Sequence, residues 1–134
     1  EPPRRTGRHY AVLVPATDAD GNDIAGVRAP MVQAPLATYT GWNLRMRGQG
    51  HGAMHEFTGS TIPLPETAEE RAVTRDPRPS IAERYASRAA YQEAIGAAAR
   101  KLVAERLMLE EDVGRCIAAA ADWHAPRHDV SLED

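Results

Sequence analysis

Residues 87–123 decide the fold, and they read SRAAYQEAIGAAARKLVAERLMLEEDVGRCIAAAADW. Apolar side chains recur in the first part of this stretch at near-heptad spacing, which is typical of a helix with one buried face. They are Tyr91, Ile95, Ala98, Leu102 and Leu109. Ser87 is placed to cap the start of this helix. Three consecutive acids at residues 110–112 favour a second helix N-terminus, because the helix dipole stabilises negative charge there. The pattern therefore predicts two helices that are separated near residues 108–109.

The second predicted helix has an apolar face of its own. Its members are Val113, Cys116, Ile117, Ala120 and Trp123. Alanine is abundant on both helices, and small side chains let two helix backbones approach closely. We therefore expect the two helices to pack as an αα-hairpin. A proline at position 126 is expected to end the helical region, which leaves residues 126–134 as a tail.

Two capping boxes predict short helices upstream of this hairpin. The tetrads TAEE at residues 67–70 and SIAE at residues 80–83 each place a hydroxyl three positions before a glutamate. In such a pair, each side chain can accept a hydrogen bond from the backbone N–H of the other residue. Two prolines within residues 76–79 disfavour helix between the boxes. The sequence thus predicts a helical region over residues 67–125.

The first half of the chain carries strand and turn signals. Residues 1–8 hold little to bury and are expected to be a flexible lead-in. Residues 10–14 and 24–27 are short, apolar and β-prone. Between them, residues 18–23 read DADGND and are rich in turn-forming side chains. This combination predicts an N-terminal β-hairpin.

Prolines and glycines interrupt residues 30–66, so no long element is expected there. Residues 35–44 (PLATYTGWNL) and 57–64 (FTGSTIPL) are apolar enough to pack, and we expect Trp42 to anchor this segment against the helices. The predicted fold is therefore α+β within one domain. It combines the N-terminal β-hairpin and a Pro/Gly-rich aromatic loop segment, together residues 9–66, with the C-terminal αα-hairpin that packs on them.

Composition argues against several functional classes. The chain has 134 residues, which suits one domain, and a net charge of −3, which argues against a broad surface for nucleic acid. Its apolar runs are shorter than the roughly 18 residues of a membrane-spanning helix, so no membrane contact is expected. Cys116 is the one cysteine, so no internal disulfide can form. Its helical spacing with apolar neighbours predicts a buried structural cysteine rather than a reactive one.

No complete catalytic or calcium-binding motif is present in the sequence. Ser60 follows a glycine, but threonine and isoleucine occupy the two glycine positions of the Gly-x-Ser-x-Gly motif of serine hydrolases. An EF-hand loop has glycine at its sixth position and glutamate at its twelfth. Counted from Asp18, the glycine here is fourth and the twelfth residue is Ala29. The acidic loop is therefore predicted to be a plain turn.

His51 and His55 are the histidines with a suggestive context, in the run GHGAMHE at residues 50–56. An i, i+4 histidine pair beside a carboxylate can bind zinc on a helix, but the surrounding glycines disfavour a helix here. We therefore assign no catalytic, cofactor-binding or metal-binding residue and expect no cofactor. A small metal enzyme that uses these two histidines is the least favoured hypothesis.

Several segments carry a resemblance to a known family. In chain order they are YAVLVP (10–15), DADGN (18–22), IAGVR (24–28), PLATYTGWNLR (35–45), TGSTIPL (58–64), SIAERY (80–85) and LVAERL (102–107). They are similar to the C-terminal section of a bacterial family of alpha/beta hydrolase domain proteins, and YTGWN at residues 39–43 is the most distinctive part. The resemblance spans about residues 10–122. It implies that the nucleophile and the catalytic histidine lie upstream, in an esterase-like core outside this section.

The resemblance and the lack of a catalytic set predict a non-catalytic structural module of an α/β-hydrolase-like protein. We expect it to pack on the hydrolase core or to shape the substrate entrance through residues 38–43 and 48–56. The predicted interaction surface comprises Tyr39, Trp42, His51, His55 and Phe57.

The alternative hypothesis is a stand-alone binding or dimerisation module. An exposed apolar patch around Trp42, Phe57 and Leu64 would support it, because such patches mark partner sites. The expected partners are thus the hydrolase core of the same protein, or a second copy of the chain.

Overall fold

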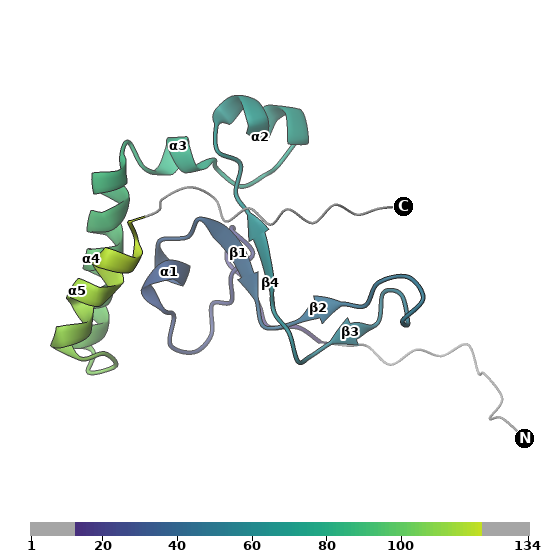
Figure 1. The fold of residues 1–134 in the computed structure, drawn as a ribbon, viewed down its shortest axis with the longest axis horizontal. Helices are drawn as coiled ribbons and strands as arrows, with labels where there is room; N and C mark the ends of the chain where they lie inside the picture. The colour runs from purple at the N-terminus through teal and green to yellow at the C-terminus, as the bar shows by residue number, and fades with distance from the viewer. Residues whose placement is uncertain (1–12, 122–134) are drawn as a thin grey trace, which may run out of the picture.

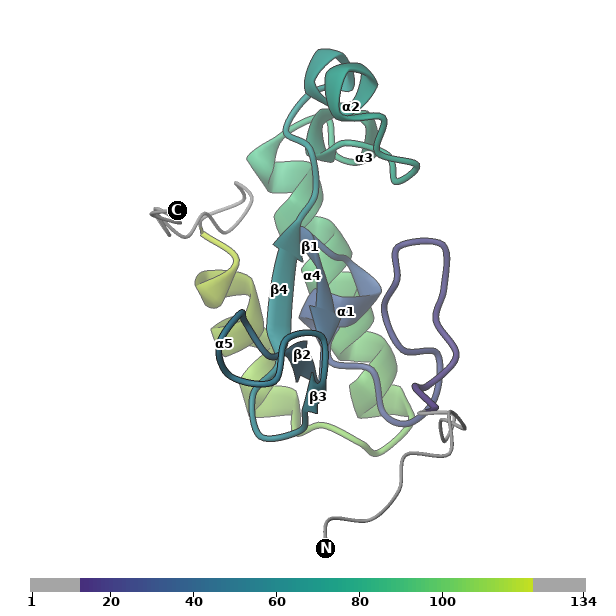
Figure 2. The same cartoon turned by 90° about the vertical axis from the view of Figure 1, so that its right-hand side faces the viewer.

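The computed structural model describes residues 13–121, and Figures 1 and 2 show their arrangement in two perpendicular views. This part of the chain forms two small antiparallel sheets and five helices, which confirms the predicted α+β class. The elements are α1 (Pro30–Gln33), β1 (Ala37–Thr40), β2 (Asn43–Leu44), β3 (Met54–His55), β4 (Ser60–Pro63), α2 (Ala68–Thr74), α3 (Ile81–Arg84), α4 (Arg88–Ala104) and α5 (Glu110–Ala119). No helix within residues 13–121 has the length and apolar character needed to cross a membrane.

Helices α4 and α5 pack side by side as the predicted αα-hairpin (Figure 1). The Ser87 hydroxyl caps α4 by accepting a hydrogen bond from the Ala90 N–H at 3.2 Å. The end of α4 is a left-handed turn at Arg106 (φ 62°), after which the Leu107 N–H donates to the Leu102 carbonyl at 2.8 Å. This arrangement satisfies the last carbonyls of the helix and redirects the chain into α5.

The short helices begin where their capping residues predict. At α2, the Thr67 hydroxyl accepts the Glu70 N–H, while the Glu70 carboxylate accepts from the Glu66 N–H, one position before the expected donor. At α3, the capping box between Ser80 and Glu83 is complete in both directions.

The strands lie in the Pro/Gly-rich segment of residues 30–66, where no long element was expected. Strand β1 pairs with β4, with Ala37 opposite Pro63 and Thr40 opposite Ser60. Beyond them, β2 and β3 pair as a second, shorter ladder. Residues 43–59, which contain β2 and β3, extend away from α4 and α5 (Figure 1). We call this segment the exposed hairpin.

The strand predicted at residues 24–27 as part of the N-terminal β-hairpin does not form. The expected turn forms, but it is closed by a single bridge between Thr17 and Asp23, and residues 24–27 form no strand. Leu13 and Val27 are exposed, so the flanking apolar side chains find no core to pack against. The rest of that prediction, at residues 10–12, lies outside the described residues, as do the predicted lead-in, the tail and Trp123.

The core lies between α4, the turn around α3 and the segment that joins α1 to β1. Its buried members are Ala34, Leu36, Leu64, Ile81, Tyr85, Tyr91, Ile95 and Ala120, and Cys116 packs against them. The Tyr85 hydroxyl donates to the Pro35 carbonyl at 3.2 Å, and burial raises the pKa of Tyr85 to about 12. Trp42 is half-buried and does not belong to this cluster, which corrects its predicted role as an anchor on the helices.

Candidate functional site

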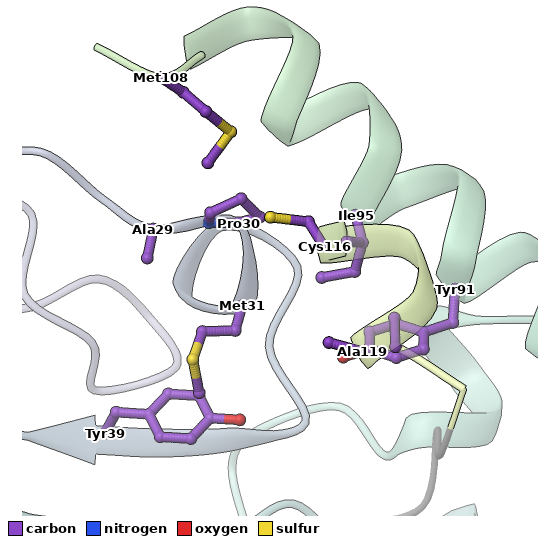
Figure 3. A pocket seen from close by; sticks show the side chains of 10 residues that line it. Ala29, Pro30, Met31, Tyr39, Tyr91, Ile95, Met108, Cys116 and Ala119 are labelled. Atoms are coloured by element: carbon purple, nitrogen blue, oxygen red, sulfur yellow. The ribbon is translucent and has the colours of Figure 1, made fainter. Parts of the chain in front are cut away.

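An apolar pocket of about 460 Å³ lies between α1, β1 and the αα-hairpin (Figure 3). It is lined by Ala29, Pro30, Met31, Tyr39, Tyr91, Ile95, Met108, Cys116, Ala119 and Ala120. None of these described lining residues is charged. Its volume falls within the range of roughly 300–1,000 Å³ that is typical of small-molecule sites.

Local structure explains how these residues meet. Tyr91 and Ile95 are four residues apart on α4, so their side chains lie on one helix face. The alanines near the end of α5 are small, which leaves space opposite that face. Pro30 begins α1, where its fixed φ suits the first helical position and its missing N–H has no cost.

Three weakly polar side chains line the pocket, Tyr39, Tyr91 and Cys116. Burial raises the pKa of the Tyr39 hydroxyl, although a backbone hydrogen bond from Leu36 opposes the change. Cys116 is half-buried and packs on the core, as its helical spacing predicted. Because the lining contains no histidine or cation, no lining residue can activate this thiol.

Of the predicted interaction surface, the structure brings two residues together. The rings of His55 and Phe57 meet edge to face, with centroids 5.9 Å apart. His51 is exposed in the turn of the exposed hairpin, and the carbonyl of Trp42 accepts hydrogen bonds from the hydroxyls of neighbouring strands. Tyr39 lines the apolar pocket instead.

The exposed hairpin presents apolar side chains that sequence reasoning only partly identified. Phe57 is 89% exposed, and Leu44 and Met46 are also largely exposed. Leu44 ends β2 and Met46 follows two residues later, and this spacing of two could have revealed both. Leu64, which was predicted to join Phe57 in an apolar patch, is only 2% exposed and belongs to the core.

The hydroxyl of Ser60 and the imidazole of His55 are not arranged for hydrolysis. The Ser60 hydroxyl donates to the Trp42 carbonyl at 3.1 Å, and His55 Nδ1 lies 3.0 Å from the Thr58 hydroxyl. That histidine–threonine pair spans three residues of an exposed loop, and no carboxylate in the described part of the chain orients the imidazole. Nor does any cluster of three metal-ligating side chains occur within residues 13–121. The arrangement therefore lacks the base–orienter geometry of an activated hydroxyl.

The acidic loop is a turn, as predicted, and its first carboxylate is fully engaged. Asp18 Oδ1 accepts the backbone N–H groups of Asp20 and Asn22, and Oδ2 pairs with Arg28. Burial opposes ionisation of Asp18, but these donors outweigh it and lower its pKa. The loop is also tied to α3 by an ion pair between Asp20 and Arg84.

A family model described as "Alpha/beta hydrolase domain" matches residues 1–118. No curated protein and no solved structure matches the chain.

Proposed function

Because the chain belongs to the alpha/beta hydrolase domain family, we propose that it is a non-catalytic structural module of a protein that hydrolyses ester bonds. In this role it packs on the catalytic core of the same protein or shapes the entrance for the substrate. The observation that carries the proposal is the exposed hairpin, because a short two-stranded ribbon with exposed Leu44, Met46 and Phe57 is marginally stable without a partner.

The chemistry of the described residues supports a non-catalytic role. A serine hydrolase needs a hydroxyl hydrogen-bonded to a histidine that a third group orients. The Ser60 hydroxyl is instead bonded to a carbonyl, and the His55 imidazole to a local threonine.

An esterase assay on this chain tests the proposal. We expect no hydrolysis of 4-nitrophenyl acetate above the rate of a heat-treated sample, because the Ser60 hydroxyl is bonded to a carbonyl and the His55 imidazole to a local threonine. Turnover that disappears in Ser60→Ala, His51→Ala or His55→Ala would show that the chain is itself catalytic and would overturn the proposal.

A second candidate function is a dimerisation module, which the same exposed side chains favour. It predicts a stable homodimer in sedimentation equilibrium that Phe57→Ser dissociates. Val73→Ser is the matched control, because Val73 is equally exposed but lies on α2, outside the exposed hairpin. A chain that stays monomeric at all concentrations would exclude this candidate and leave the structural module.

A further inference from the structure

We infer that the apolar pocket binds an unbranched hydrocarbon chain, of the kind that forms the acyl or alkyl part of an ester. The link to an ester rests on the proposed function. The inference extends the proposed function by naming the part of the ester, its hydrocarbon chain, that this pocket binds.

The lining favours a hydrocarbon ligand because most of its side chains are apolar. It contains no charged residue, so a charged ligand buried there would have no opposite charge to pair with, and the polar groups of its side chains are two tyrosine hydroxyls and one thiol. Ile95 and Tyr91 are buried core residues that form one wall, so an apolar ligand would extend the existing core.

The shape of the lining suits a flexible chain. In Figure 3 the side chains run from Met108 at one end, past Pro30 and Cys116, to Tyr39 and Ala119 at the other. Methionine side chains are unbranched and adapt to the contour of a ligand. Met31 and Met108 both line the pocket, and Met31 is half-exposed, so it can move to admit a chain.

Cys116 gives a direct readout of occupancy, because it is the one cysteine of the chain and it lines the pocket. The experiment measures the rate at which N-ethylmaleimide alkylates Cys116 in the presence of 1-hexanol, 1-octanol or 1-decanol. We expect saturable protection whose midpoint concentration falls about 15-fold for each two added methylenes, that is about fourfold per methylene. The fall should stop once the chain is longer than the pocket.

A pair of neighbouring variants separates pocket binding from general effects of alcohols. Ala119→Leu places a larger side chain in the pocket and should weaken protection by 1-octanol about tenfold. Ala118→Leu is the control, because Ala118 is also exposed on α5 but does not line the pocket, and it should leave the midpoint unchanged.

Two results would overturn the inference. One is protection that does not saturate or does not depend on chain length in the unaltered protein. The other is an equal response of the two leucine variants. Neither result bears on whether the exposed hairpin packs on a hydrolase core, because the assay uses this chain alone and probes a different surface. Conversely, a chain that binds octanol but fails to contact a core would refute the proposed function and leave the pocket assignment intact.

Discussion

Asn22 shows how a single side chain can complete a sheet. It is fully buried, at 0% exposure, and its Nδ2 donates to the Ala37 carbonyl at 3.2 Å while its Oδ1 accepts the Tyr39 N–H at 2.7 Å. These are the outward-facing groups of β1, so the amide takes the place of a neighbouring strand. Gly21 makes this possible, because its φ of 78° favours glycine and a Cβ there would lie 2.9 Å from Thr38 Cγ2.

Replacement of Asn22 by alanine should therefore be costly. Asn22→Ala leaves a buried N–H and a buried C=O of β1 without partners, and we expect unfolding free energy to fall by about 2–4 kcal/mol. Urea denaturation followed by circular dichroism measures this change. Asn43→Ala is the control, because Asn43 is exposed on β2, and it should cost less than about 0.5 kcal/mol. Equal losses in the two variants would contradict the role assigned to Asn22.

At the scale of elements, α2, α3, α4 and α5 could be predicted from the sequence, whereas α1 and the pairing of the strands could not. Helix starts depend on contacts within three residues, such as Ser87 with Ala90, so a local pattern is sufficient. The β1–β4 ladder instead joins residues twenty or more positions apart, as with Ala37 and Pro63, and a sequence pattern does not specify that partner. The acidic turn was predictable for the same local reason, whereas the described residues of the strands expected on either side of it, 13–14 and 24–27, are exposed and cover no core.

The candidate site was mostly hidden from sequence reasoning for a related cause. Its walls come from α1, β1, α4 and α5, and no local motif links them. Tyr39 was selected because it lies in a distinctive aromatic segment, and Cys116 was correctly expected to pack inward. Met31 and Met108 carried no signal, because an isolated methionine predicts neither a pocket nor its absence.

The cap of α3 contains a carboxylate, Glu83, whose ionisation makes the stability of the fold depend on pH. The backbone N–H and the hydroxyl of Ser80 donate to the Glu83 carboxylate at 2.8 and 2.7 Å, respectively. The Arg71 guanidinium donates to the same carboxylate. Together they lower the pKa of Glu83 from its ordinary 4.5 to about 2. Because the folded state favours the ionised form, this contribution is present above pH 4.5 and is lost as the pH falls from 4.5 towards 2.

Glu83→Gln should accordingly flatten the dependence of stability on pH in that window. Thermal melts between pH 2 and pH 6 measure it, with the melting temperature of the unaltered chain expected to fall more steeply below pH 4.5 than that of the variant. Ser80→Ala should flatten the same window, because it removes a donor to the carboxylate. Parallel curves for all three proteins would contradict this account.

At the scale of the whole molecule, the described residues fall into a packed body and one projecting part. The body is the αα-hairpin with α1, β1 and the turn around α3, which share the buried cluster. The exposed hairpin extends from the opposite end of the β1–β4 ladder, away from the helices (Figure 1). Its two-residue strands and exposed Phe57 contribute little to the body, and in the proposed function this is the part that contacts another surface.

Hydrogen exchange tests this central claim most directly. The backbone amides of residues 43–59 are compared between this chain and the whole product of the native gene, with the amides of α4 as an internal reference. The proposed packing on a hydrolase core predicts exchange about tenfold or more slower for residues 43–59 in the native product, and unchanged exchange for α4. Equal rates for residues 43–59 in the two proteins would show that no core covers the exposed hairpin and would contradict the account.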